Sequence, residues 1–290
     1  MDKKAFLAGS IAAFTWGTVF VFGQISVQTG FHPFLVAFLR FLSASIFLAL
    51  YHFAKGERFF LKSSDIIHFL ILGASGIFGM NAFIFYSLTL TDSTITSLLM
   101  NANGFIIGIL GFFLLKERIS MLEMMGLIVG TGGCYLIFTQ GDISRISHSN
   151  LAGNTLAALA SFCWAFYSVW SKKTGVIEKY GAVLSTLWAC VFGTVMLGIA
   201  VLMLSVPLHF DMKNVLIGVY LGIVPAGVGF TLWFYSISKL KTIIPGIIQF
   251  IAPLTTAVLA VILLRQNISV ATVIGGLLII AGVLFTLEKQ

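Results

Sequence analysis

Ten long apolar runs divide this chain, and no other feature of the sequence constrains its fold as strongly. They cover residues 6–24, 33–53, 66–88, 94–115, 122–138, 151–171, 180–204, 214–236, 243–264 and 269–287. Most contain close to the ~20 residues that an α-helix needs to cross the hydrocarbon core of a bilayer. An apolar fraction of 59% and a charged fraction of 9% also exclude an ordinary soluble domain. The sequence therefore predicts an all-α, polytopic membrane protein with ten transmembrane helices.

The basic residues are distributed unevenly between the two sides of the predicted bundle. If the segments between the runs alternate sides, one side carries thirteen of the 17 Lys and Arg residues, and the other carries only Arg145, Lys213 and Arg265. By the positive-inside rule the Lys-rich side, with both termini, is cytoplasmic. The net charge of +7 then reflects loops that face anionic headgroups, so the lipid bilayer is an expected partner and nucleic acid is not.

The two halves of the chain are related by an internal repeat. A shift of 149 residues places Phe85-Tyr86-Ser87 on Phe234-Tyr235-Ser236, Gly126 on Gly275 and Gly133 on Gly282. Five spans per repeat is an odd number, so the second half must be inverted relative to the first. We therefore predict two inverted five-helix repeats, residues 1–145 (spans 1–5) and residues 146–290 (spans 6–10).

Inverted repeats are typical of secondary transporters, because exchanging the conformations of the two halves interconverts outward-open and inward-open states. A channel is an alternative, since inverted duplication also occurs in channels. An intramembrane enzyme is disfavoured, because the five histidines are scattered over run ends and loops and no HExxH or nucleophile-elbow pattern occurs. We expect no catalytic residue, metal site or cofactor. The acidic residues also avoid the middle of the runs, which favours neutral, zwitterionic or anionic solutes over quaternary amines.

The segment after the fourth run carries a resemblance to a known family. The sequence LLKERIS at residues 114–120, the glycines that follow it, and a tryptophan in the first helix of each half (Trp16 and Trp164) resemble the EamA family of the drug/metabolite transporter superfamily. The resemblance covers essentially the whole chain. It implies a secondary transporter in the cytoplasmic membrane of a prokaryote. The family's acidic residue matches Glu117, but the second half has Gln266 at that position, which weakens any mechanism that needs a symmetric pair of carboxylates.

We interpret the chain as a carrier that moves a small metabolite, an amino acid or a similar compound, outward by alternating access. Broad export of drugs or nucleoside-like compounds is the alternative within the transporter class. The oligomeric state and the coupling ion do not follow from the sequence.

Arg40 is the one basic residue deep inside a run, roughly 10 Å along its helix from Pro33 at 1.5 Å per residue. A guanidinium buried in a bilayer needs compensation, so two roles are open. Arg40 is a clamp for a substrate carboxylate or phosphate, or it snorkels to the outer interface or bonds to carbonyls of a neighbouring helix. An Arg-Phe pair, here Arg40-Phe41, is common in the family that the chain resembles, which favours the structural role.

The predicted substrate site consists of amide and aromatic side chains inside the runs. The candidates are Trp16, Asn81, Asn101, Asn103, Trp164, Tyr167, Trp233 and Gln249. Amides in a bilayer need hydrogen-bond partners, and these tryptophans lie away from the usual interfacial belt. Asn101 and Asn103 are two residues apart, about 200° around a helix, so they cannot both face one pocket. Packing between helices is the alternative role for all eight side chains.

Glycine and proline positions mark candidate hinges at Gly79, Pro225, Gly227, Pro245 and Pro253. Pro225 and Gly227 interrupt span 8, and the other two prolines flank Gln249 in span 9. Because proline removes a backbone donor and interrupts a helix, we expect parts of these spans to move.

Overall fold

The computed structural model describes the chain except residues 1, 92, 143–149, 209–210, 265–268 and 288–290. Its elements are α1 (Lys3–Gln28), α2 (Pro33–Ala54), η1 (Ser63–Asp65), α3 (Ile66–Leu72), η2 (Gly73–Gly79), α4 (Met80–Leu90), α5 (Ser93–Asn101), α6 (Asn103–Leu115), α7 (Met121–Thr139), α8 (Leu151–Lys173), α9 (Val176–Met203), α10 (Met212–Leu221), η4 (Gly222–Val228), α11 (Gly229–Lys239), α12 (Ile243–Ile248), α13 (Ile251–Leu264) and α14 (Val270–Phe285). The described part of the chain contains no β-strand.

Each predicted span coincides with one helix or with one broken helix. Within the described residues, eight segments are long and apolar enough to cross a membrane. The shorter apolar helix α14, and α8 with Lys172 and Lys173 in its last turn, complete the ten. Spans 3, 4, 8 and 9 are built from more than one element, η1-α3-η2-α4, α5-α6, α10-η4-α11 and α12-α13. Near its start, α9 is kinked at Gly181, whose backbone is not helical. The prediction of an all-α, ten-helix membrane protein is confirmed.

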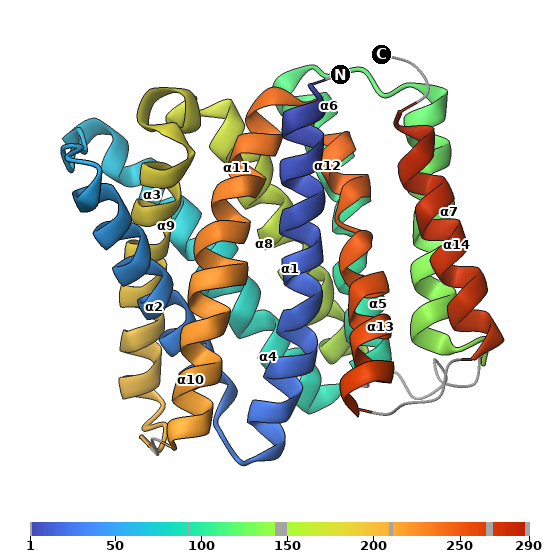
Figure 1. The fold of residues 1–290 in the computed structure, drawn as a ribbon, viewed down its shortest axis with the longest axis horizontal. Coiled ribbons are helices and arrows are strands. Elements are labelled where there is room, and N and C mark those ends of the chain that lie inside the picture. The colour runs from blue at the N-terminus through green and yellow to red at the C-terminus, as the bar shows by residue number, and fades with distance from the viewer. Residues whose placement is uncertain (1, 92, 143–149, 209–210, 265–268, 288–290) are drawn as a thin grey trace.

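The two halves cross the bundle in opposite directions. In Figure 1, α3 lies above α4, whereas α10 lies below α11, so span 3 runs down the view and span 8 runs up it. The first turn of α1 lies at the top of the view, on the same side as the segments 55–62, 116–120 and 240–242 that carry many of the lysines. We call this end of the bundle the Lys-rich face.

The backbone irregularities repeat with the same 149-residue offset as the sequence. The π-helical turns η2 and η4 span Gly73–Gly79 and Gly222–Val228. The helices α7 and α14 begin at matching N-caps, Ser120 and Ser269, whose hydroxyls accept hydrogen bonds from the backbone three residues later. The inverted repeat is therefore built into the backbone as well as into the residue pattern.

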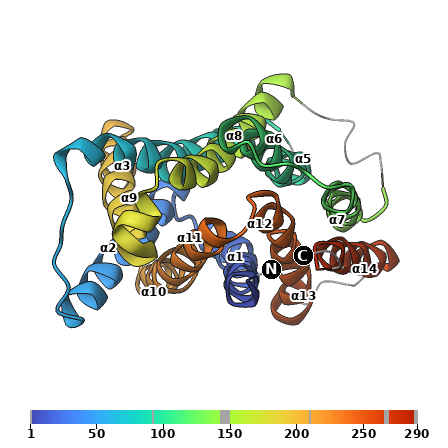
Figure 2. The same cartoon turned by 90° about the horizontal axis from the view of Figure 1, so that it is seen from above.

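The elements of the two halves alternate around the centre of the molecule. Seen from above, α8, α6 and α5 lie on one side, α11, α1 and α13 lie on the other, and α12 lies between them (Figure 2). This arrangement brings α1 and α8, the first helices of the two repeats, to opposite sides of the same centre.

The helices α7 and α14 pack through two reciprocal glycine contacts. A Cβ on Gly133 would lie 2.5 Å from the carbonyl oxygen of Gly275, and a Cβ on Gly126 would lie 2.6 Å from that of Gly282. The four glycines are two repeat-related pairs, so the contacts follow the internal symmetry. Because side chains are missing at these points, the two backbones approach closely, as in many membrane helix pairs.

We expect Gly133→Ala to lower the stability of the protein by ~1–3 kcal/mol, the usual range for overpacking, because the obstructing atom belongs to a backbone that cannot rotate away. Gly132→Ala is the matched control, since a Cβ on Gly132 would have no atom within 4 Å. Thermal unfolding of the purified variants in detergent measures the difference. Equal unfolding midpoints for the two variants would show that this helix pair has room for a methyl group.

Candidate functional site

Four aromatic side chains meet at the centre of the bundle. Trp16 comes from α1, Trp164 from α8, and Phe230 and Trp233 from α11. The ring centroid of Trp16 lies 5.1 Å from that of Trp164 and 5.1 Å from that of Trp233. Phe230 lies 5.8 Å from Trp16 and 5.3 Å from Trp164. All four side chains are buried, with at most 9% exposed. We call them the aromatic cluster.

Helical spacing and the internal repeat explain why the cluster forms. Phe230 and Trp233 are three residues apart and therefore share one face of α11. Trp16 and Trp164 come from matching helices of the two repeats, and their rings meet edge to face at 88°. The indole N–H of Trp233 donates to Ser168 Oγ at 3.1 Å. Phe230 was not among the predicted site residues, although its position three residues before Trp233 places it on the same helix face.

The π-helical turn η4 presents a backbone carbonyl to the cluster. The amide of Gly229 bonds to the carbonyls of Val224 and Ala226 and not to that of Pro225. The Pro225 oxygen instead accepts a hydrogen bond from Trp16 Nε1 at 3.0 Å. The indole of Trp16, in repeat 1, is thus hydrogen-bonded to span 8 of repeat 2. A change in the conformation of η4 would move the carbonyl that accepts this bond.

Gln249 makes hydrogen bonds to three residues at the centre of the bundle. It lies in the break between α12 and α13, where its Oε1 accepts a hydrogen bond from Trp164 Nε1 at 3.1 Å. Its Nε2 donates to Asn103 Oδ1 and to the carbonyl of Gly246, the latter at 3.1 Å. Asn103 is the first residue of α6, directly after the break in span 4. One side chain therefore joins the broken spans of both repeats to the aromatic cluster.

The other two amides bond within their own spans. Asn101 Nδ2 donates to the carbonyl of Ser97 at 2.8 Å, and Asn81 Nδ2 donates to that of Ile77 at 2.6 Å. Only Asn103 of the span 4 pair bonds to Gln249, in line with the expectation that the two asparagines face different ways. Among the predicted substrate-site residues, Asn103 and Gln249 are therefore linked by hydrogen bonds to the aromatic cluster. The hydrogen bonds that Asn81 and Asn101 donate do not reach it.

Four of the five candidate hinges lie at or beside the breaks of the spans. Gly79 ends η2, and Pro225 and Gly227 lie inside η4. Pro253 lies in the first turn of α13, which follows the break in span 9, whereas Pro245 lies in the first turn of α12, at the start of that span. A proline in a first turn is compatible with a helix, so both prolines mark helix starts.

Arg40 and Tyr167 are buried beside the aromatic cluster, and each has a polar atom without a hydrogen-bond partner among the described residues. Arg40 is 8% exposed, and its Cζ lies 4.9 Å from the ring centroid of Phe41 and 5.9 Å from that of Phe230. Its Nε has no partner among the described residues. The ring of Tyr167 lies 6.0 Å from that of Phe230, and its buried hydroxyl also has no described partner.

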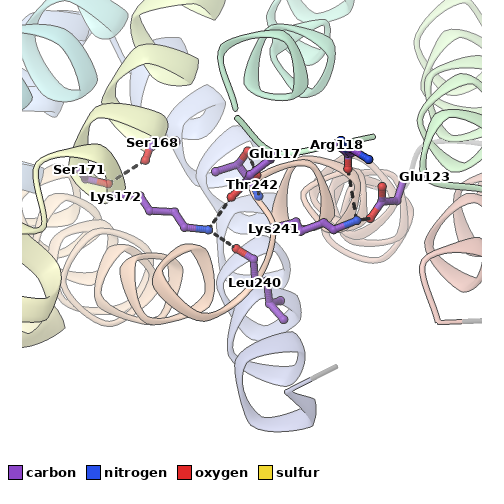
Figure 3. Close-up of polar contacts among 9 residues, drawn as sticks. All are labelled: Glu117, Arg118, Glu123, Ser168, Ser171, Lys172, Leu240, Lys241 and Thr242. Carbon is purple, nitrogen blue, oxygen red and sulfur yellow. Dashed lines mark hydrogen bonds and ion pairs between the residues drawn. The ribbon is translucent and has the colours of Figure 1, made fainter. Parts of the chain in front are cut away.

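At the Lys-rich face, an ion pair joins the two repeats. Lys172 Nζ, at the end of α8, donates to Glu117 Oε1 at 2.8 Å and to the carbonyl of Leu240 at 2.6 Å (Figure 3). Glu117 Oε2 accepts hydrogen bonds from both the amide and the hydroxyl of Thr242, each at 2.7 Å. The side chains of Lys172 and Glu117 are 20% and 17% exposed. The carboxylate of repeat 1 therefore binds three donors of repeat 2.

A second ion pair lies beside the first. Lys241 Nζ donates to Glu123 Oε1 at 3.0 Å and to the carbonyl of Arg118 at 3.3 Å (Figure 3). Glu123 Oε2 accepts from the amide of Ser120 at 2.6 Å, which completes the capping box of α7. We call the contacts of Glu117, Glu123, Lys172, Lys241 and Thr242 the inter-repeat network.

The sequence did not predict this network. Lys172 and Lys241 are two of the thirteen basic residues on the predicted cytoplasmic side, and Glu117 matched only the acidic position of the family. The partners lie far apart in the chain. Glu117 is 55 residues from Lys172 and 125 from Thr242, and Glu123 is 118 residues from Lys241. The one available signal was that Glu117 has Gln266 as its repeat partner, so that a carboxylate occurs in one half alone.

Comparison with known proteins places this architecture in a family. The EamA-like transporter family matches residues 3–139 and 151–288, nearly all of both halves. The chain belongs to this family. It is 29% identical to a protein of Archaeoglobus fulgidus named "uncharacterized transporter", with 100% of this chain and 99% of that protein covered.

Two further relatives and one solved structure are also similar to this chain over nearly its whole length. Proteins of Salmonella typhimurium and Escherichia coli, each named "probable amino-acid metabolite efflux pump", are 25% and 24% identical, with 97% of this chain and 94% of each relative covered. One crystal structure with 21% sequence identity matches with a TM-score of 0.88 over 100% of both chains, which shows the same fold. The chain is therefore a multi-pass membrane transporter of a small molecule, as predicted.

Proposed function

We propose that this transporter exports an amino acid or a similar small metabolite across the cytoplasmic membrane by alternating access. The two moving units are the repeats, residues 1–145 and 146–290. The observation that carries the proposal is the aromatic cluster, in which Trp16 and Trp164 of opposite repeats meet at a buried centre bounded by the broken spans. A site at the junction of inverted repeats, lined by interrupted helices, is where carriers of this design bind substrate.

The chemistry of the centre supports a zwitterionic or anionic metabolite with an apolar part. The cluster offers ring faces and edges, Gln249 and Asn103 offer amide groups, and Arg40 offers a positive charge. Glu123 is the only acidic side chain among the described buried residues, and it belongs to the inter-repeat network at the Lys-rich face. A cationic drug would therefore find no carboxylate here. The names of the two efflux-pump relatives support the amino-acid class and the outward direction.

The inter-repeat network supports a carrier that is closed at its Lys-rich face. It connects the segment 116–120 of repeat 1 to α8 and to the segment 240–242 of repeat 2. With the orientation expected from the positive-inside rule, this face is cytoplasmic. Opening a path from the cytoplasm then requires these ion pairs to separate.

Counterflow in proteoliposomes tests the proposal. Vesicles loaded with unlabelled amino acids are expected to accumulate labelled amino acid transiently and with saturation, because only a carrier exchanges one solute for another. Nucleosides and a quaternary amine serve as comparison solutes, and protein-free vesicles as the control. Flux without saturation or counterflow would indicate a channel, and a chemically altered solute would indicate an enzyme. Counterflow of nucleosides in preference to amino acids would favour the broader exporter.

A further inference from the structure

Arg40 is a buried cation for which the described residues supply no counter-charge. Its side chain is 8% exposed, and its described contacts are the ring faces of Phe41 and Phe230. The Nε atom is completely buried and has no hydrogen-bond partner among the described residues. Aromatic rings attract a cation weakly compared with an anion, so a guanidinium in a bilayer is left under-compensated.

The two structural roles considered for Arg40 do not match its surroundings. A side chain that snorkels to the interface would be exposed at its head, whereas Arg40 is more than nine-tenths buried. A side chain that ties its helix to neighbouring carbonyls would donate guanidinium N–H groups to them, and Nε has no acceptor among the described residues. The role that remains is binding to a group outside the described residues.

Tyr167 supplies a second unused donor at the same place. Its side chain is 0% exposed, and its hydroxyl has no described hydrogen-bond partner. Phe230 contacts both groups, with its ring centroid 6.0 Å from that of Tyr167 and 5.9 Å from Arg40 Cζ. A hydroxyl and a guanidinium that share neighbours and lack acceptors are complementary to an anion.

We propose that Arg40 and Tyr167 bind the carboxylate of the transported metabolite, an inference that rests on the proposed export of amino-acid-like compounds. The planar guanidinium of Arg40 can donate two parallel N–H hydrogen bonds to a carboxylate. The Tyr167 hydroxyl donates a third hydrogen bond. One positive charge balances one carboxylate, whereas a phosphate dianion would keep an excess negative charge in the bilayer. Phe230 contacts Arg40, Tyr167 and Trp16, so the rest of the metabolite would face the aromatic cluster.

The substrate class follows from this geometry. It comprises small carboxylates, zwitterionic or anionic, that carry an apolar or aromatic group. Amino-acid amides, amines without a carboxylate and inorganic phosphate are outside it.

Ligand-induced thermal stabilisation of the purified full-length protein tests the inference, with L-amino acids and the matching amino-acid amides as paired probes. The wild type is expected to be stabilised by at least one amino acid and not by its amide. Tyr167→Phe, which removes one oxygen atom, is expected to weaken binding of that amino acid about tenfold. Arg40→Gln is expected to abolish its binding, and Arg40→Lys to restore part of it. Inorganic phosphate is expected to give no shift.

Several outcomes would overturn the inference. Equal stabilisation by an amino acid and its amide, binding of phosphate in place of the carboxylate, or unchanged affinity in Tyr167→Phe would each refute a carboxylate site. Tyr167→Phe decides the matter even when Arg40→Gln fails to fold. Counterflow of amino acids by a protein that does not distinguish acid from amide would refute this site while leaving the proposed function standing. Absence of both binding and counterflow for every amino acid would refute both proposals.

Discussion

Replacing Gln249 by leucine is expected to reduce transport at least tenfold while the protein still inserts in the membrane. The substitution places an apolar side chain of similar size in the break between α12 and α13. It removes the acceptor of Trp164 Nε1 and the donor to Asn103 Oδ1. Each buried group left without a partner costs about 1–3 kcal/mol, and every 1.4 kcal/mol is a factor of about ten. The geometry of both the aromatic cluster and the break in span 4 depends on this side chain.

Counterflow normalised to the amount of folded protein measures the effect of Gln249→Leu. A double-mutant cycle with Asn103→Leu is the internal control, since two residues that act through one hydrogen bond give non-additive losses. Asn101→Leu is the comparison on the same span, and it is expected to reduce transport less, because Asn101 bonds to Ser97 in its own helix. Additive losses from Gln249→Leu and Asn103→Leu, or a larger loss from Asn101→Leu, would show that transport does not depend on the bond between Gln249 and Asn103.

Lys172→Gln is expected to open the Lys-rich face of the transporter. Lys172 donates to Glu117 and to the carbonyl of Leu240, and both side chains of the ion pair are more than three-quarters buried. Exposed ion pairs contribute ~0–1 kcal/mol, and breaking a fully buried pair costs ~3–5 kcal/mol. For this intermediate case we expect ~2 kcal/mol, a shift of more than tenfold toward the state that is open at this face.

Lys173→Gln is the matched control, because the neighbouring lysine has the same charge and lies over the ring of Trp170 at 6.0 Å. The readout is maleimide labelling of a cysteine introduced at Ile244, a fully buried residue two positions beyond Thr242. Alanine replaces the three native cysteines, Cys134, Cys163 and Cys190. In inside-out vesicles, Lys172→Gln is expected to raise the labelling rate more than tenfold, and Lys173→Gln to leave it unchanged.

Equal rates in the two variants would show that the inter-repeat network does not hold this face closed. Labelling from right-side-out vesicles instead would show that the Lys-rich face lies outside the cell. Glu117→Gln, which keeps an acceptor for Thr242 but removes the charge, is expected to give an intermediate rate. It also copies the amide that the second repeat has at residue 266.

The difference between Glu117 and Gln266 has a mechanical consequence. In a symmetric inverted repeat the two faces of the bundle would be closed by equivalent contacts. Here the carboxylate occurs in the first half only, and Gln266 lies outside the described residues. The Lys-rich face is closed by charge-assisted hydrogen bonds, which are roughly twice as strong as neutral ones. We therefore expect the carrier to rest with its Lys-rich face closed.

The part of the site that the sequence predicted consists of residues whose role follows from local chemistry. An amide or an aromatic residue inside an apolar run is recognisable from its position alone. Trp16, Trp164, Tyr167, Trp233, Asn103 and Gln249 were all proposed in this way, and their role in binding stays a prediction. Their connections were not predictable. The π-helical turns insert an extra residue into the helical repeat, so the faces on the two sides of η2 and η4 are rotated relative to a regular helix.

The sequence by itself determined the number of spans, their inversion and the side on which the positive charge gathers. These properties follow from apolar length, from the parity of a repeat and from counts of charge, none of which depends on how the helices pack. Only the tertiary structure decided that Gln249 bonds to Trp164 and Asn103 and that Lys172 reaches Glu117. It also decided that Arg40 Nε and the Tyr167 hydroxyl have no partner among the described residues. Such contacts depend on the rotation of each helix about its axis and on the breaks within it, because a side chain in a bilayer finds its partner across a helix interface and not along the chain.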